Sequence, residues 1–259
     1  MPKIDDEELL LFLSHTGPKN LENFKTQACI SKLKRKYEGL ISNNPVVAYT
    51  YLGVIEAYNN RNDEALRLLH VALKLAPNEL VILHNIAKTY EQAGDFNSAI
   101  DYFFKALSLA PNDADMFRNA YTLAEFFCNT DVLNKLEQIN TSLYRAFPES
   151  PVLKLIEFLS GRAFDFNNYE AQISCCFKAI HKILNLHSNE MVRYFNFEGN
   201  YLVNFVEFDL HDVDVIEKIN KAYENEIYLF ASQQDDGGFD FYDKLNQSCI
   251  SFTMMNQDN

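Results

Sequence analysis

Four residues in one short stretch, Asp209, His211, Asp212 and Asp214, have side chains that could bind a divalent metal ion. Carboxylates and imidazoles are common ligands of such ions. Successive side chains of an extended chain point in alternate directions, however, so these four cannot converge on one ion without further ligands from elsewhere. The stretch also lies where a predicted strand leads into a predicted helix, and there Asp212 would cap the helix. We therefore predict no metal site.

Other signatures of catalysis are missing from the sequence. It contains no glycine-rich phosphate loop, no nucleophile elbow and no HExxH zinc motif. Cys175 and Cys176 are adjacent but form no CxxC pair, and we interpret them as packing residues of a helix. His181 and His187 lie on or just after an apolar helix, where surface or packing roles are expected. The sequence therefore predicts no catalytic residues and no cofactor.

A repeat of 34 residues organises the middle of the chain. Residues 46–79 and 80–113 have matching patterns, and each contains the run Leu-Ala-Pro-Asn near its end, with Pro77 and Pro111 at equivalent places. Apolar residues recur at three- and four-residue spacing on both sides of a polar break, which predicts two helices and a tight turn in each unit. Such units bury their apolar faces only by stacking, so the repeat predicts a solenoid.

The second unit shows how a helix pair would be closed. Gly94 fits the end of the first helix, where a left-handed residue lets the chain reverse, and Asp95 can cap the second helix. Small residues occupy positions where two helices could approach closely, and larger ones could fill the gap between units. The small residues are Ala65, Ala72, Ala99 and Ala106, and the larger ones are Leu69 and Phe103.

This pattern resembles the tetratricopeptide repeat (TPR) family. The family's signature positions hold Tyr49, Leu52, Gly53, Glu56, Ala65, Leu69, Ala72 and Pro77 in the first unit, and Leu83, Ile86, Ala87, Tyr90, Ala99, Phe103, Ala106 and Pro111 in the second. The first unit departs from the family at Glu56, where an aromatic residue is usual, and at Asn60, which replaces the turn glycine but tolerates a left-handed conformation. The resemblance implies a mainly α fold, a right-handed superhelical array of antiparallel helix pairs.

The repeats would occupy residues 46–150. Two units, 46–79 and 80–113, are clear, and a degenerate unit at 114–150 keeps Phe117 but has its proline three residues late. Residues 1–45 are predicted to form N-terminal capping helices, including a helical stretch over 20–42, because a terminal unit must cover one apolar face of the array.

The remaining residues depart from the repeat. Residues 151–190 are predicted to be a helical extension, with helices across 151–159 and 169–186. Residues 191–259 are predicted to be an acidic α+β segment, and it is either a small subdomain or an irregular helical cap that bears a hairpin. Its expected elements are a β-hairpin of residues 192–198 and 201–210, a helix over 212–232 and a short strand at 239–242.

Composition limits the class of partner and the compartment. The net charge of −13 argues against binding to nucleic acid or to an anionic membrane surface. Residues 191–259 contain 13 acidic against four basic residues, which could attract a basic partner or serve solubility alone. No apolar run suits a membrane span, and acidic residues precede the short apolar run at 9–13. With five cysteines and no CxxC pair, we predict a cytoplasmic protein.

The resemblance also implies a peptide-binding groove along the first helix of each pair. Carried over to this chain, its predicted residues are Thr50, Tyr51, Val54, Tyr58, His84, Asn85, Lys88, Gln92, Arg118, Asn119, Thr122 and Phe126. Asn85 and Asn119 recur at a position where family members hydrogen-bond a peptide backbone, and an amide can donate and accept at once. Solvated surface roles for both asparagines remain the alternative.

One family function is not expected. Members that bind chaperones hold a terminal carboxylate with a clamp of basic and amide residues. The corresponding positions here are Thr50, Val54, Asn85, Asp115 and Asn119, of which only Asn85 matches. Without paired cations nothing would neutralise a buried carboxylate, so we do not expect capture of that motif.

We therefore predict a non-enzymatic interaction protein, an adaptor or a substrate chaperone, that binds a peptide or helix of a partner protein in the groove. The alternative is that the repeats present a small C-terminal catalytic or metal-dependent module. Self-association as a homodimer through Tyr51, Tyr58 and Phe126 is a further option.

Overall fold

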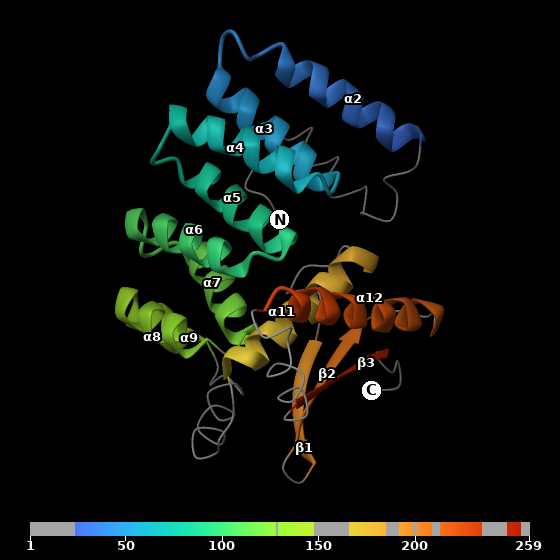
Figure 1. Cartoon of the computed structure of the whole chain (residues 1–259). Coiled ribbons are helices and arrows are strands. Elements are labelled where there is room, and N and C mark those ends of the chain that lie inside the picture. The colour runs from blue at the N-terminus through green and yellow to red at the C-terminus, as the bar shows by residue number, and fades with distance from the viewer. Residues whose placement is uncertain are drawn as a thin grey trace. The chain divides into compact units, whose positions relative to one another are not determined.

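The structure is a computed structural model of the chain (Figure 1). It describes residues 24–127, 129–147, 166–184, 192–198, 201–208, 213–234 and 248–254. By its internal contacts the chain divides into two compact units, Met1–Ala120 and Tyr121–Asn259.

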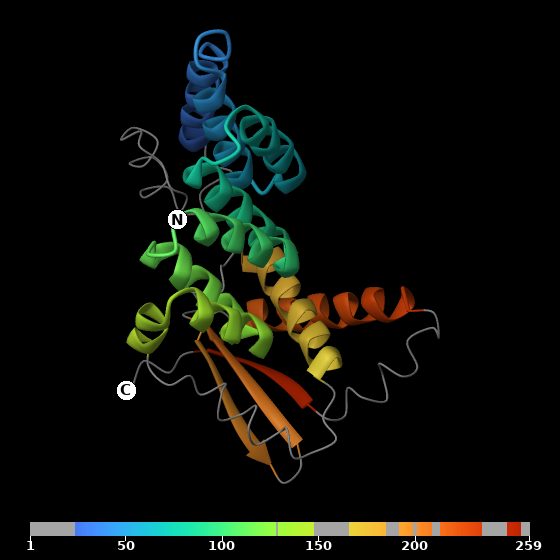
Figure 2. The same ribbon diagram turned by 90° about the vertical axis from the view of Figure 1, so that its left-hand side faces the viewer.

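The first unit is an array of consecutive helices that pack on one another. These are α2 (Phe24–Glu38), α3 (Pro45–Tyr58), α4 (Asn62–Leu75), α5 (Leu80–Ala93), α6 (Phe96–Leu109) and the first part of α7 (Ala114–Phe126). The pairs α3–α4 and α5–α6 are the two predicted repeats, and Figure 2 shows the helices stacked in chain order. The predicted array of helix pairs is confirmed.

The ends of these helices are formed by the residues that the sequence indicated. Gly94 has the left-handed φ of 79° after α5, and the side chain of Asp95 accepts a hydrogen bond from the Ser98 amide at 3.1 Å. Asn60 has a φ of 59° between α3 and α4, the only positive φ of a non-glycine residue in the described part of the chain. The left-handed turn expected at Asn60 is therefore confirmed.

Close helix packing inside the first repeat depends on a position without a side chain. A Cβ added to Gly53 would lie 2.6 Å from Leu69 Cγ and 3.2 Å from the Ala65 carbonyl oxygen. The predicted packing residues of both repeats are 0% exposed: Ala65, Ala72, Ala99 and Ala106, with Leu69 and Phe103. The predicted pattern of small and large packing residues is confirmed.

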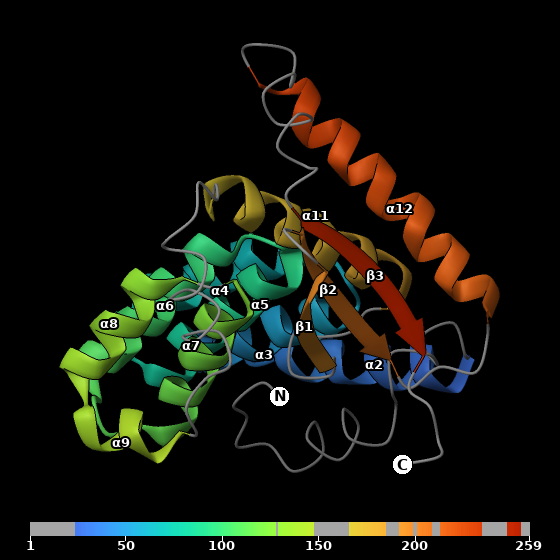
Figure 3. The same cartoon turned by 90° about the horizontal axis from the view of Figure 1, so that it is seen from below.

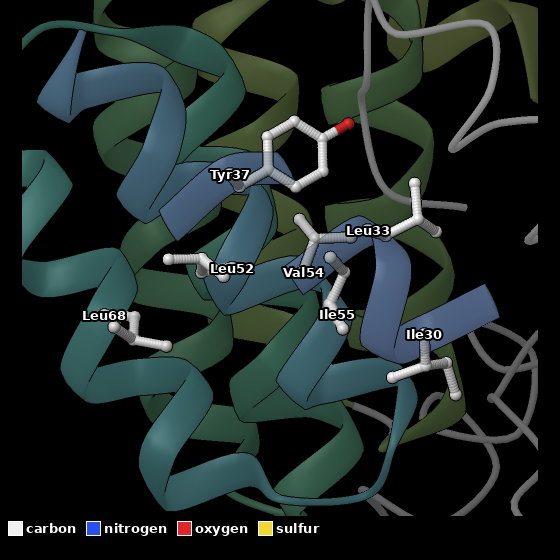
Figure 4. Close-up of a cluster of buried hydrophobic side chains, with 7 residues drawn as sticks. All are labelled: Ile30, Leu33, Tyr37, Leu52, Val54, Ile55 and Leu68. Carbon is white, nitrogen blue, oxygen red and sulfur yellow. The ribbon is translucent and has the colours of Figure 1, made fainter. Parts of the chain in front are cut away.

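Helix α2 covers one end of the array. Its apolar face carries Ile30, Leu33 and Tyr37, each at most 3% exposed, and they pack with α3 residues such as Val54 and Ile55 (Figure 4). These α2 residues repeat at helical spacing, so one face of the helix can be buried while the other meets water. The predicted N-terminal helix thus begins at Phe24 and ends at Glu38 among the described residues.

The second unit begins inside α7 and continues the helical pattern irregularly. Helix α8 (Thr130–Ile139) begins after Asn129, whose side chain accepts from the Val132 amide at 3.1 Å. Asn140 then caps the short helix α9 (Thr141–Ala146) and so divides the second helix of the third pair. The predicted degenerate third unit thus has two short helices, α8 and α9, after its first helix.

The rest of the described second unit combines two helices and three strands. These are α11 (Phe166–Leu184), β1 (Val192–Glu198), β2 (Tyr201–Phe208), α12 (Val213–Ser232) and β3 (Ser248–Met254). Strands β1 and β2 are antiparallel, with Glu198 paired to Tyr201, which confirms the hairpin. Helices α11 and α12 confirm the expected helices over 169–186 and 212–232, and they pack together through residues such as Cys175 and Ile227.

Strand β3 was not expected from the sequence. It pairs in parallel with β2, giving the sheet order β1-β2-β3 shown in Figure 3. The parallel return follows α12, because parallel neighbours need a long connection between them. The expected helix at 151–159 and strand at 239–242 lie outside the described residues.

Replacing Gly53 by alanine should destabilise the array. A methyl group must displace the fully buried Leu69 side chain, so Gly53→Ala should lower the free energy of unfolding by about 1–3 kcal/mol, despite alanine's better helix propensity. Gly39→Ala is the control, since its Cβ would meet only the Arg35 and Lys36 carbonyl oxygens at 3.4 Å. Urea denaturation compares the two, and equal stability of Gly53→Ala and wild type would contradict the packing.

Cys175 and Cys29 should differ in reactivity. Burial raises the pKa of the Cys175 thiol to about 11, whereas Cys29 is exposed on α2. At pH 7.5 iodoacetamide should modify Cys29 in the native protein and Cys175 only after denaturation, because the thiolate is the nucleophile. Peptide mass spectrometry measures both, and native labelling of Cys175 at the rate of Cys29 would refute its burial.

Candidate protein-binding surface

The first repeat presents fewer of its predicted peptide-binding residues than the sequence suggested. Tyr51 and Tyr58 are half-buried, but Thr50 and Val54 are only 4% and 3% exposed. Val54 packs in the cluster with α2, and the Thr50 hydroxyl donates to the Val46 carbonyl oxygen at 2.8 Å. Val54 is therefore a core residue rather than a groove residue, because α2 packs against it.

In the first repeat Glu56 forms ion pairs at the position where the family usually has an aromatic residue. Its carboxylate lies 2.5 Å from Lys34 Nζ on α2 and 2.6 Å from Arg61 Nε, just before α4. The Glu56 side chain is 9% exposed, so water screens these contacts less than ordinary surface pairs. The two ion pairs link α2, α3 and the residue just before α4. Two features of the sequence could have indicated them: an acidic residue at a position where the family has an aromatic one, and the basic run at 32–36.

In the second repeat, α5 buries polar side chains where an open groove was expected. His84 and Asn85 are each 2% exposed, Gln92 is 7% exposed, and Lys88 is half-buried. Lys88 Nζ donates to Glu91 Oε2 at 2.5 Å, and the Glu91 side chain is itself 2% exposed. Buried polar groups need hydrogen-bond partners inside the protein, so these side chains are expected to form contacts within the array.

Contacts of Gln92 and His84 link successive repeats. Gln92 Nε2 donates to the Ala57 carbonyl oxygen at 2.9 Å and to Asn60 Oδ1 at 2.8 Å, which ties α5 to the end of α3. His84 Nε2 lies 3.3 Å from Asn119 Nδ2 on α7. If the amide donates here, the imidazole carries its proton on Nδ1. The predicted groove positions thus include contacts that hold neighbouring repeats together.

On α7 the predicted residues divide into accessible and buried ones. Arg118 is exposed, and Asn119 and Thr122 are half-buried. Phe126 is 7% exposed, and its ring packs edge-on against Phe177 of α11 with centroids 5.9 Å apart. Phe126 is therefore a core residue of the second unit, and its expected roles in peptide binding and self-association do not fit this position.

The accessible part of the predicted surface is smaller than expected. The predicted residues that are exposed or half-buried are Tyr51, Tyr58, Lys88, Arg118, Asn119 and Thr122. Those of the first unit combine aromatic rings, an amide and cations, which suit contacts to the backbone and side chains of a polypeptide, whereas Thr122 lies in the second unit.

The acidic stretch considered first for metal binding is only partly described. Asp214 is exposed near the start of α12, whereas Asp209, His211 and Asp212 lie outside the described residues. Within the described ranges, no three His, Cys, Asp or Glu side chains lie together as a metal site would require. The helices that the structure describes include none with the length and apolar character of a membrane span.

Comparison with known families agrees with the geometry of the second helix pair. The family model described as tetratricopeptide repeat matches residues 81–113, the stretch that contains nearly all of α5 and the whole of α6. The chain carries a tetratricopeptide repeat. Such repeats generally bind other proteins and are generally non-catalytic. No curated protein matches this sequence.

The ion pairs of Glu56 should contribute measurably to the stability of the helical array. Glu56→Gln leaves Lys34 facing a neutral partner in a largely buried site, so we expect a loss of about 1–3 kcal/mol in the free energy of unfolding. The control is Glu64→Gln, which removes a more exposed ion pair with Arg67 and should change stability little. Urea denaturation measures both, and equal effects of the two variants would contradict a special role for Glu56.

Proposed function

We propose that this TPR protein is a cytoplasmic, non-enzymatic adaptor or substrate chaperone that binds a peptide or helical segment of a partner protein. The contact surface consists of the accessible predicted residues of the first unit, on α3, α5 and the part of α7 up to Ala120. It includes Arg118 and Asn119 on α7, Tyr51 and Tyr58 on α3, and Lys88 on α5, whose side chain is 12% exposed.

The observation that carries this proposal is the state of Asn119. Its amide nitrogen lies 3.3 Å from His84 Nε2, and its side chain is half-buried rather than enclosed. With the nitrogen directed to His84, the amide oxygen is the group that can accept a hydrogen bond from a backbone N–H of a partner. The contact with His84 restricts the Asn119 side chain, and such restriction before binding lowers the entropy cost of association.

Charge distribution indicates how a basic partner would be attracted. Residues 24–120 contain 11 basic and 10 acidic residues, so the array itself is nearly neutral. The excess of acidic residues lies in residues 191–259, with 13 acidic against four basic. A basic partner would therefore be drawn by that segment, whereas the array would supply the specific contacts.

The adaptor role and the compartment rest on the sequence. The chain lacks the phosphate-loop, nucleophile-elbow and zinc motifs of common enzyme classes. Its five cysteines suit a reducing compartment, and burial keeps the Cys175 thiol protonated at neutral pH. These observations support a binding protein that acts inside the cell.

The proposal predicts that a double variant, Arg118→Glu with Asn119→Ala, loses a partner that the wild-type protein retains. Affinity purification from the native cell followed by quantitative mass spectrometry would identify that partner, and a binding titration would measure the affinity. Removing a charge contact and a backbone hydrogen bond should weaken binding by about 10-fold or more.

The matched control is Lys135→Glu, because Lys135 is an exposed cation on α8, the second helix of its pair. This control should retain the partner with unchanged affinity. The proposal fails if the double variant and the control bind the partner equally well. A loss of binding in both variants would also oppose it, since the interaction would then depend on overall charge.

A further inference from the structure

A second group of interacting side chains lies where the first and second repeats meet. It consists of His70 on α4, Tyr90 on α5, and Tyr102 and Lys105 on α6, here called the His70 cluster. None of these residues belongs to the predicted peptide-binding surface. His70 and both tyrosines are half-buried, and Lys105 is exposed.

The His70 cluster is joined by direct contacts among three helices. His70 Nε2 lies 3.3 Å from the Tyr90 hydroxyl, and the rings of Tyr90 and Tyr102 stack with centroids 5.6 Å apart and planes 21° apart. The His70 ring lies 5.8 Å from the Tyr102 ring. Lys105 Nζ lies 3.9 Å from the centroid of the Tyr102 ring, a cation–π distance.

These aromatic rings are part of the packing between the repeats. Tyr90 and Tyr102 both pack against the buried cluster that contains Leu69 and Ala72 of α4 and Ile82 and Ile86 of α5. Because that cluster joins α4 to α5, a change at the rings reaches the contact between the two repeats.

The charged groups around His70 oppose a positive charge on its imidazole. Burial lowers the pKa of His70 below its ordinary value of 6.5, and Lys105 on α6 and Lys74 on α4 lower it further. Burial raises the pKa of both Tyr90 and Tyr102, so that both hydroxyls keep their protons. The Tyr90 hydroxyl can therefore donate to Nε2 of a neutral His70.

Acidic residues act on the tyrosines of the cluster. Asp95 contributes to the raised pKa of Tyr90, after burial, and Asp101 contributes to that of Tyr102, after burial and the neighbouring Tyr90. The pKa of His70 is nevertheless lowered, by burial first and then by Lys105 and Lys74.

We propose that the His70 cluster is a proton-sensitive contact between the first and second repeats, which is firm when His70 is neutral and weakens when His70 takes up a proton. Protonation makes Nε2 a donor, ends the acceptance of the Tyr90 proton and adds a third cation beside Lys74 and Lys105. Helix α5 also carries Gln92, which hydrogen-bonds the end of α3. The same change therefore loosens the packing of α5 against α3.

The direction of the pH effect follows from proton linkage. The imidazole of the unfolded chain, with an ordinary pKa near 6.5, takes up a proton before the folded one as the pH falls. The stabilisation from neutral His70 is complete above about pH 6.5 and is lost as the pH falls through the lowered pKa of the folded state.

His70→Gln tests this proposal, because glutamine can still hydrogen-bond Tyr90 but does not titrate. Thermal unfolding midpoints are measured at pH 7.5 and pH 5.0 for the full chain. The wild-type midpoint should fall by about 2 °C more than that of His70→Gln between these pH values. Amide protection factors, which remove the intrinsic effect of pH on exchange, should fall at pH 5.0 in α4 and α5 of the wild type alone. Equal pH dependence of the two proteins overturns the proposal.

Two further measurements separate the cluster from other titrating groups. Lys105→Met removes the neighbouring cation and should reduce the pH response, whereas Lys135→Met on α8 should leave it at the wild-type size. Equal responses in the two lysine variants would overturn the charge argument. An NMR titration of wild-type His70 should show a midpoint below 6.5, and a midpoint at or above 6.5 would overturn the proposal even if His70→Gln failed to fold.

Discussion

The close approach of helices within each repeat is the constraint on which the array depends. At Gly53 the backbone of α3 comes so near to α4 that an added Cβ would lie 2.6 Å from Leu69 Cγ. Ala65 and Ala72 are completely buried on α4, and Ala99 and Ala106 repeat this arrangement on α6. With these small residues in place, Leu69 and Phe103 can fill the space between helices. Leu69 also belongs to the buried cluster with Ile82 and Ile86 of α5, so the spacing inside the first repeat affects its contact with the second.

The first helices of the repeats serve stability and accessibility together. Gln92 and His84 connect successive repeats by hydrogen bonds to Asn60 and Asn119. A polar side chain that holds the array together is not freely available to a ligand, because its hydrogen-bonding capacity is partly used. Among the predicted residues of α7, Arg118 is exposed, whereas the amide nitrogen of the half-buried Asn119 already contacts His84.

Charged residues join the capping helix to the array. Glu56 occupies a position where the TPR family usually has an aromatic residue, and its ion pairs with Lys34 and Arg61 join the capping helix α2 to the first repeat. The second repeat keeps the aromatic residue as Tyr90, which stacks on Tyr102 instead. Equivalent positions thus carry an ionic contact at the capped end and an aromatic contact between repeats, since only the end repeat has α2 as its neighbour.

The sequence by itself determined the elements whose signals are local. Gly94, Asp95 and Asn60 fixed the turns, and the apolar spacing fixed α3 to α6, α11 and α12, because caps and helical periodicity act over a few residues. Only the tertiary structure decided that Val54 and Phe126 are core residues and that Glu56 meets Lys34, since each outcome depends on a partner from another helix. The parallel pairing of β3 with β2 was likewise decided at long range, where a short strand carries no signal of its neighbour.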